Sequence, residues 1–220
     1  MRAGAAAVNA YDRGMSPLYI DEHMLVFEKP SGLLSVPGRT QPDCLSARAQ
    51  AIWPDALVVH RLDMDTSGLL VMARGIESQR RLGLAFERRR VHKVYLAVVE
   101  GRPAEDSGSV DLPLIVDWPN RPRQKVDHEH GRRALTHWRV LERGADRSTM
   151  ELLPVTGRSH QLRVHMMTLG HPIVGDELYG TAGERLLLHA AKLELPHPDD
   201  GRMMQFESAP PFATRLASIG

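Results

Sequence analysis

His60-Arg61-Leu62-Asp63-Met64-Asp65-Thr66-Ser67-Gly68 is the stretch of sequence from which the rest of the chain can be interpreted. Short apolar runs flank it at 57–59 and 69–72. Such runs predict buried strands, although periodicity alone does not distinguish them from helix. A polar loop between two core strands is a common place for catalytic groups. The alternative is a hairpin-like turn whose Asp and Ser side chains only satisfy backbone groups.

The pattern H-R-L-D-x-x-T-S-G closely resembles the active-site motif of the RluA-type pseudouridine synthases, a family that isomerises uridine in structured RNA. Other segments resemble further motifs of this family: 28–38 (which contains K-P-S-G), 157–165, 170–176 and 187–190. Two more, 111–115 and 117–122, resemble the subgroup that acts on both large-subunit (23S) ribosomal RNA and a tRNA anticodon stem-loop. The resemblance therefore implies an RNA isomerase with RNA of these two classes as its partner.

Composition is ordinary for a globular protein, with 220 residues, 42% of them hydrophobic and 25% charged. We expect a disordered tail over residues 1–16 and one catalytic domain over residues 17–220. The single cysteine, Cys44, cannot form an internal disulfide, which favours a reducing compartment. No apolar run approaches the roughly 20 residues of a spanning helix, and no signal peptide is recognisable. We expect a cytoplasmic protein that makes no membrane contact.

Positive charge is concentrated although the formal net charge is only +1. Residues 80–93 carry a local excess of five positive charges, and residues 118–133 an excess of three. The ordinary interpretation of each cluster is a solvated helix face or loop. Next to a resemblance to RNA-modifying enzymes, the clusters instead indicate phosphate contacts. We therefore predict that RNA is bound by Arg88, Arg89, Arg90, Arg121, Arg123 and Lys125.

Local patterns predict many strands and few helices. Leu162, Met166 and Leu169 have the spacing of one inward helix face, and Ser159 is a plausible N-cap for that helix. The predicted strands are a pair within 18–28, then 57–59, 69–72, 93–100, 135–141, 149–155 and 186–188. The predicted helices are 45–52, 76–90 and 159–169, and residues 117–133 are predicted to be a long loop.

Such an order of elements predicts an α+β fold built on a largely antiparallel sheet. The resemblance implies the same class in more detail. It implies the pseudouridine synthase fold, a long bent mixed sheet with flanking helices and a central active-site cleft.

The resemblance also assigns three catalytic residues. Asp63 matches the nucleophile, and a carboxylate can divide uridine isomerisation into easier steps through a covalent adduct. The sequence leaves three routes open: attack of Asp63 at C1′, attack at C6, or assistance to glycal formation. Arg163 matches the arginine that forms a salt bridge with this aspartate, whose ionised form an adjacent guanidinium would favour. Tyr95 matches the tyrosine that stacks on the target uracil and that could accept or relay the C5 proton. Asp65 falls at a variable position of the motif, and we expect it to cap the loop.

Enzymes that act on a base within RNA must first move it out of the stack. Arg61 lies beside Asp63 in sequence, and we expect it to fill the vacated space or hold the neighbouring phosphate. An ion pair with Asp65 is the structural alternative for Arg61. Arg158 precedes the predicted helix and would add to an anion site at its N-terminus.

Two other functions compete with this interpretation. A metal-dependent hydrolase is suggested by 11 histidines, but His160 and His165 do not have the H-E-x-x-H spacing. A non-catalytic RNA-binding module is the second alternative. We expect an enzyme without metal or cofactor that acts as a monomer.

Overall fold

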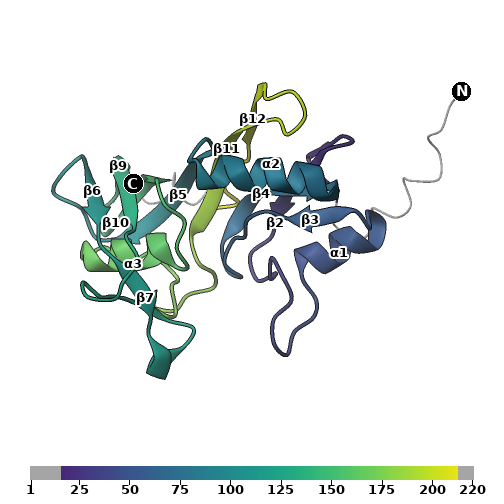
Figure 1. Ribbon diagram of the computed structural model, residues 1–220. Coiled ribbons are helices and arrows are strands. Elements are labelled where there is room, and N and C mark those ends of the chain that lie inside the picture. The colour runs from purple at the N-terminus through teal and green to yellow at the C-terminus, as the bar shows by residue number, and fades with distance from the viewer. Residues whose placement is uncertain (1–15, 213–220) are drawn as a thin grey trace, which may run out of the picture.

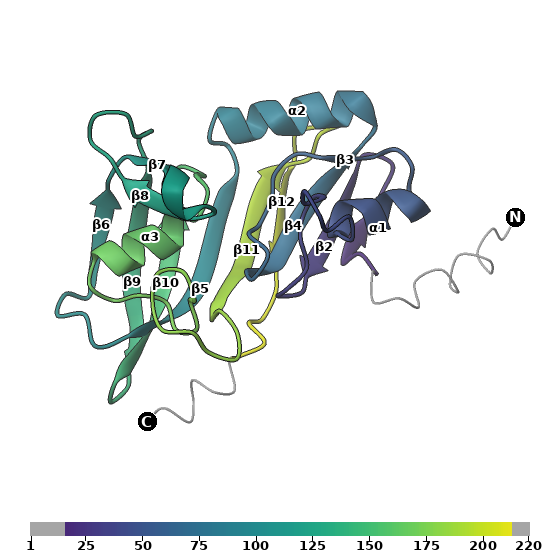
Figure 2. The same cartoon turned by 90° about the horizontal axis from the view of Figure 1, so that it is seen from below.

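A mixed sheet of ten strands organises residues 16–212, the part of the chain that the computed structural model describes. Three α-helices pack against the sheet, and a separate two-stranded hairpin lies beside α3 (Figures 1 and 2). The architecture is α+β, as predicted. The tail expected over residues 1–16 lies outside the described residues except for Ser16.

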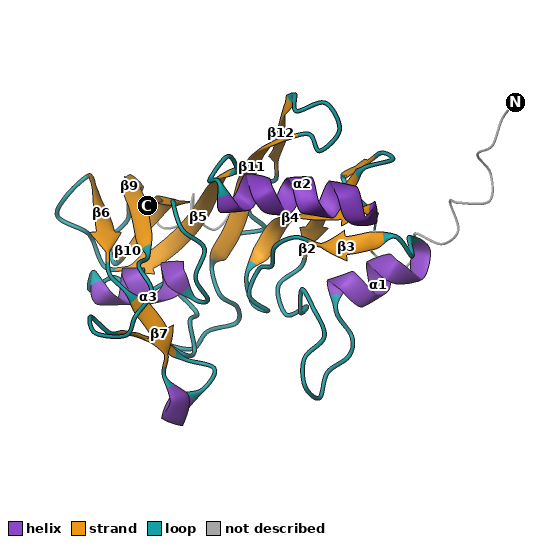
Figure 3. Ribbon diagram, viewed as in Figure 1, coloured by secondary structure: helices purple, strands orange, loops and turns teal. Residues whose placement is uncertain are grey.

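The strands of the large sheet follow the order β1-β2-β4-β11-β5-β10-β9-β6, with β3 added to β4 and β12 added to β11. Every pairing is antiparallel except that of β4 with β11. Figure 3 distinguishes the elements by type. The strands are β1 (Tyr19–Ile20), β2 (Met24–Lys29), β3 (Ala56–Val58), β4 (Ser67–Arg74), β5 (His92–Glu100), β6 (Ser107–Asp111), β7 (Leu114–Val116), β8 (Gln124–Val126), β9 (Leu135–Arg143), β10 (Arg147–Pro154), β11 (Leu188–Pro196) and β12 (Met203–Glu207). The helices are α1 (Leu45–Ile52), α2 (Gly75–Glu87), α3 (Gln161–Thr168) and the 3-10 turn η2 (Trp118–Asn120).

Strand β4 is apolar on both faces because both faces are covered. Leu70 and Met72 point into one core cluster, to which α1 contributes Leu45. Leu69 and Val71 point into another, to which α2 contributes buried side chains. Successive side chains of a strand alternate between faces, so a strand covered on both sides reads as a continuous apolar run.

The other half of the sheet is covered by α3. Leu162 and Met166 are buried in a cluster with side chains of β5 and β10, and Leu169 packs at its margin. The predicted inward face of this helix is therefore confirmed. Tyr95 on β5 contacts both this cluster and the α1 cluster, so it lies where the two halves of the sheet meet.

Gly68 allows β4 and β11 to run parallel directly behind the motif loop. Its φ is +112°, and a Cβ atom there would collide with the backbone of Ala190. Ser67 and Gly68 pair with His189 and Ala190 in this register. The last glycine of the H-R-L-D-x-x-T-S-G pattern is thus required by backbone contact.

Several local predictions were wrong. Residues 117–133 contain η2 and β8, which pairs with β7, and are not one long loop. His160, not Ser159, is the N-cap of α3, and it makes no side-chain capping bond. Strands β6, β7 and β12 were missed. Of the strand predicted at 186–188 only Leu188 is in β11, which continues to Pro196.

Candidate active site

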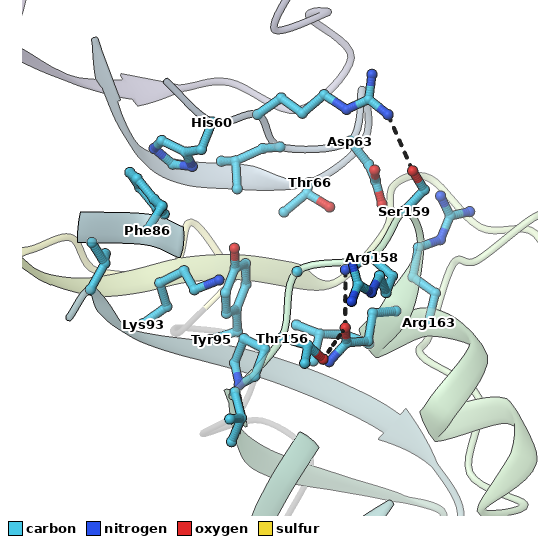
Figure 4. A pocket seen from close by; sticks show the side chains of 18 of the residues that line it. His60, Asp63, Thr66, Phe86, Lys93, Tyr95, Thr156, Arg158, Ser159 and Arg163 are labelled. Atoms are coloured by element: carbon cyan, nitrogen blue, oxygen red, sulfur yellow. Dashed lines mark hydrogen bonds between the residues drawn. The ribbon is translucent and has the colours of Figure 1, made fainter. Parts of the chain in front are cut away.

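A pocket of about 610 Å³ opens over the middle of the sheet (Figure 4). Three parts of the chain line it: the motif loop, the segment from the end of α2 into β5, and the segment from the end of β10 into α3. Asp63, Tyr95 and Arg163 all belong to the lining, so the predicted catalytic residues are brought together. Arg61, Arg89 and Arg158 line it as well.

Asp63 and Tyr95 reach the pocket from different elements. Asp63 is half-buried in the motif loop, where its backbone carbonyl accepts a hydrogen bond from Thr66 N (3.2 Å). Tyr95 points into the pocket from the middle of β5 (Figure 4). Burial, together with the nearby charge of Asp63, raises the pKa of the Tyr95 phenol well above its ordinary value. Tyr95 is therefore a neutral phenol at physiological pH and can stack on a base.

The motif loop is held by Lys29, which the sequence indicated only as part of the K-P-S-G segment. Lys29 is fully buried, and its Nζ donates to the carbonyl oxygens of Pro30 (2.8 Å), Leu33 (2.7 Å) and Met64 (2.8 Å). Burial lowers the pKa of Lys29 to about 8, and Asp65 and Asp63 partly oppose that shift. One ammonium thus connects the K-P-S-G segment to the residue next to Asp63.

Two serines complete this support. Ser31 Oγ donates to the Asp65 carbonyl (2.7 Å), and Ser35 Oγ donates to the Leu62 carbonyl (2.6 Å) while accepting from Leu62 N (3.0 Å). The carbonyls of residues 62, 64 and 65 are therefore all held by residues 29–35. No side-chain hydrogen bond of Asp65 is found in the described chain, so its predicted capping role is wrong. The signal for the real anchors was the polar K-P-S-G-L-L-S segment beside an apolar strand.

Arg163 does not form the predicted salt bridge with Asp63. Its Nε and Nη2 donate to the two carboxylate oxygens of Asp176, both at 2.7 Å, and both side chains are almost completely buried. Burial alone would lower the pKa of Arg163, but the hydrogen bonds and charge of Asp176, with a smaller contribution from Asp63, raise it. Arg163 therefore lies near Asp63 while its fork is occupied by Asp176.

Tyr179 connects this ion pair to the hairpin β7–β8. Its hydroxyl accepts from Gln124 N (2.6 Å) and lies 2.7 Å from His160 Nδ1. The Arg163 and Arg123 guanidinium carbons lie 5.2 Å and 5.4 Å from its ring centroid. A single tyrosine thus packs the hairpin against the start of α3, a relationship that no local sequence pattern indicated.

The two arginines predicted beside the substrate lie at the pocket but are held differently. Arg61 is exposed and its Nη2 donates to Ser159 Oγ (3.1 Å), so it does not pair with Asp65. Ser159, expected to be a helix cap, instead meets Arg61 across the pocket (Figure 4). Arg158 Nε donates to the Arg133 carbonyl (3.1 Å). Burial and two neighbouring arginines lower the pKa of Arg158.

The other predicted RNA-binding residues form two groups. Arg88, Arg89 and Arg90 follow α2 and are exposed, and Arg89 lines the pocket with a φ of +56°. Arg121, Arg123 and Lys125 belong to the hairpin, where the Arg121 guanidinium lies 4.0 Å from the ring centroid of the exposed Trp118. The contacts of both groups with RNA remain predictions.

His60 anchors the start of the motif loop. Its Nε2 accepts a hydrogen bond from Val71 N (3.0 Å), and its ring stacks on Phe86 with centroids 4.8 Å apart. Burial lowers the pKa of His60 to about 3, and the charge of Lys93 adds to this shift. His60 is therefore a neutral structural acceptor.

The histidines that suggested a metalloenzyme lie apart. His165 is buried against Thr136, whereas His160 contacts Tyr179. Over residues 16–212, no three His, Cys, Asp or Glu side chains are grouped as a metal site would require. In the same range, no helix is long and apolar enough to cross a membrane.

Comparison with known proteins gives one consistent family. The family described as RNA pseudouridylate synthase matches residues 23–168. The dual-specificity RNA pseudouridine synthase RluA of Vibrio vulnificus is 54% identical over 193 residues, which cover 82% of this chain and 77% of that protein. RluA of Yersinia pestis is 48% identical over 206 residues, covering 90% of this chain and all of that protein.

Solved structures agree with the sequence comparison. Human RNA pseudouridylate synthase domain containing 1 superimposes with a TM-score of 0.78 at 29% identity, covering 93% of this chain and 86% of that one. Human RNA pseudouridylate synthase domain containing 4 gives a TM-score of 0.76 at 24% identity, which supports the fold alone. The predicted pseudouridine synthase fold is thereby confirmed.

Proposed function

Because the chain belongs to the RNA pseudouridylate synthase family, we propose that it isomerises uridines in stem-loops of two RNA classes, a tRNA anticodon stem-loop and 23S ribosomal RNA. Membership of the family makes the protein an isomerase that acts on RNA. The choice of these two RNAs is supported by relatives named dual-specificity synthases that are 54% and 48% identical to this chain.

The reaction breaks the C1′–N1 bond of uridine and joins C1′ to C5 of the same uracil. In the proposal, Asp63 is the nucleophile and Tyr95 stacks on the uracil. The observation that carries it is the arrangement of these two residues: Asp63 and Tyr95 line one pocket, and the loop of Asp63 is held by Lys29. A nucleophile on a loop held at the carbonyls of residues 62, 64 and 65 needs little reorganisation during reaction.

Arg163 has a changed role in this proposal. Since Asp176 occupies its fork, Arg163 supplies positive potential to Asp63 without a direct hydrogen bond. A cation close to a carboxylate favours its ionised form even without contact, because charge interactions in a partly buried site are weakly screened. Asp176 thus acts on Asp63 through the position of Arg163.

Arg61 is the residue proposed to enter the RNA stack. Its hydrogen bond to Ser159 lies at an exposed position, so little is lost when RNA replaces it. The backbone of the hairpin RNA would be held by Arg158, by Arg88, Arg89 and Arg90, and by Arg121, Arg123 and Lys125 on the hairpin β7–β8. We propose that one chain is sufficient for this contact, so that the protein acts as a monomer.

The test uses two isolated RNA hairpins, an anticodon stem-loop and a 23S stem-loop, each compared with the RNA from which it is taken. Sequence-specific recognition favours loops, where flipping a base costs less than in a stem. We expect pseudouridine in both hairpins, with kcat/KM within about tenfold of the intact RNAs. Binding of both without pseudouridine formation would favour a non-catalytic RNA-binding module. A loss of several orders of magnitude on the isolated hairpins would show that distant contacts are needed.

A further inference from the structure

Lys93 reaches into the pocket beside Tyr95 and has no protein partner there. The two residues are two positions apart on β5, so their side chains point to the same face of the sheet. Both line the pocket (Figure 4). Lys93 Nζ lies against the backbone of Gly157, where an added Cβ would be 3.6 Å from it. Within residues 16–212, Lys93 makes no hydrogen bond and no ion pair.

Lys93 differs from Lys29 in the hydrogen-bond acceptors that the fold provides. Lys29 is fully buried and Lys93 is half-buried, and burial lowers the pKa of each. Lys29 is given three carbonyl acceptors by the fold, whereas Lys93 is given none. Withdrawing an ammonium from water without an acceptor costs free energy. Lys29 therefore has a structural role, and the acceptor of Lys93 must come from the molecule that occupies the pocket.

The position of Lys93 selects which part of the substrate it meets. In Figure 4 Lys93 lies on one side of the Tyr95 ring and Asp63 on the other. This step rests on the proposed role of Asp63, whose targets are at the C1′ and C6 end of the base. A uracil that stacks on Tyr95 with that end toward Asp63 presents its opposite edge, with the O4 carbonyl, to Lys93. An ammonium only donates hydrogen bonds, so it matches O4 of uracil and not the N4 amino group of cytosine.

We propose that Lys93 is a catalytic residue whose ammonium donates a hydrogen bond to O4 of the flipped uracil. In the route through C1′, the Asp63 carboxylate bonds to C1′ as the C1′–N1 bond breaks; the electron pair of the broken bond stays with N1, and the negative charge spreads through the ring to O4 and C5. The uracil then turns, C5 bonds to C1′ as the Asp63–C1′ bond breaks, the C5 proton is lost to water, and N1 takes a proton from water. A donor placed at O4 before the reaction stabilises this charge as it develops. The same contact selects uracil over cytosine.

The test combines Lys93→Met and Lys93→Arg with an anticodon stem-loop that carries uridine or 4-thiouridine at the target position. Sulfur at position 4 is a weaker acceptor than oxygen. We expect Lys93→Met to slow single-turnover isomerisation by about 100-fold, the loss typical of one oxyanion donor. Lys93→Arg should recover part of the rate, and RNA affinity should change little. The thio substitution should slow the wild type but have no further effect in Lys93→Met, because both changes remove one interaction.

Two outcomes would overturn the proposal. The first is a rate decrease in Lys93→Met with the thio substrate that equals the product of the decreases caused by each change alone, since Lys93 and O4 would then act independently. The second is weaker RNA binding in Lys93→Met with a flatter salt dependence, since that indicates a phosphate contact. Lys192→Met is the control, because Lys192 pairs with Glu207 at the surface (3.0 Å) and should leave the rate unchanged. If the wild type does not isomerise the hairpin, the proposed function fails. If the wild type isomerises the hairpin and Lys93→Met does so at the same rate, this inference alone fails.

Discussion

The guanidinium of Arg163 forms a bidentate, buried ion pair with Asp176, with both nitrogen–oxygen distances at 2.7 Å. Asp176 Oδ1 also accepts from the backbone of Leu178 (3.0 Å) and Tyr179 (3.1 Å). Both oxygens of this carboxylate therefore accept from Arg163, and Oδ1 also accepts from the backbone of the loop that follows α3. Arg163 is oriented by that loop, and its effect on Asp63 is exerted through charge.

Asp176→Asn should destabilise the protein and reduce activity. Removing one partner leaves the Arg163 charge buried without its counter-ion, which costs about 3–5 kcal/mol. The matched control is Asp111→Asn, which breaks the exposed bidentate pair with Arg133 (2.8 Å) and should cost about 1 kcal/mol or less. Urea unfolding and turnover of both variants provide the comparison. Equal losses of stability in the two variants would contradict the account of Asp176.

Lys29 should make stability depend on pH above neutrality. Its pKa is lowered to about 8 in the folded protein from 10.5, so between these values the unfolded chain binds more protons. Stability therefore rises with pH across this window, by up to about 3 kcal/mol from this group. The measurement is the free energy of unfolding of wild type minus that of Lys29→Met, from pH 7.5 to 10. We expect this difference to shift in favour of the wild type as pH rises, and a constant difference would show that Lys29 titrates normally.

The elements with strong local patterns could be predicted from sequence. Helix α1 spans the predicted residues, since an alanine-rich run is followed by Pro54 just beyond its end. Strands β4 and β5 were predicted because burial on both faces leaves a continuous apolar run. Strand β8 and the turn η2 were not, because β8 is a three-residue strand held by its pairing with β7 and by the bond from Gln124 N to Tyr179, and η2 is a single turn closed by Asn120 N and the Asp117 carbonyl. Short strands that depend on tertiary packing have no periodicity to detect.

The same division holds for the site. The motif resemblance placed Asp63 and Tyr95 together, although 32 positions separate them, and the structure puts both in one pocket. The motif resemblance did not identify Asp176 as the partner of Arg163. Asp176 is 13 residues from Arg163 and Asp63 is much further away in sequence, and the sequence does not show which of the two the folded loops bring to the guanidinium. Lys29 was missed for a related reason. Its acceptors include a carbonyl 35 residues away, and no sequence pattern displays backbone carbonyls.

Replacing Arg88, Arg89 and Arg90 together by Gln should weaken RNA binding and flatten its salt dependence. All three are exposed, and each phosphate contact contributes about 0.9 to the slope of log K against log salt for a duplex. The slope should therefore fall by about 2–3 while the single-turnover rate at saturating enzyme stays close to that of the wild type. An unchanged slope would identify the cluster as an ordinary solvated surface.

Arg61→Met should affect target uridines according to how well they are stacked. If Arg61 fills the space left by the flipped base, its loss matters most where unstacking is costly. We expect a larger decrease in single-turnover rate for a uridine flanked by purines in a stem than for the same uridine in an open loop. Ser159→Ala provides the control, because it removes only the resting partner of Arg61. Equal losses on both RNAs would argue against a role in flipping.

The role of Asp63 can be measured most directly with an anticodon stem-loop labelled with tritium at C5 of the target uridine. Joining C1′ to C5 releases the C5 hydrogen, so tritium in water counts each isomerisation. We predict that the wild type releases the label to completion, whereas Asp63→Asn releases none above background and still binds the RNA within about threefold, because the substitution hardly changes side-chain size. Asp65→Asn should release it at a rate close to that of the wild type. Tritium release by Asp63→Asn, with loss of release in Asp65→Asn, would contradict the assignment of Asp63 as the nucleophile.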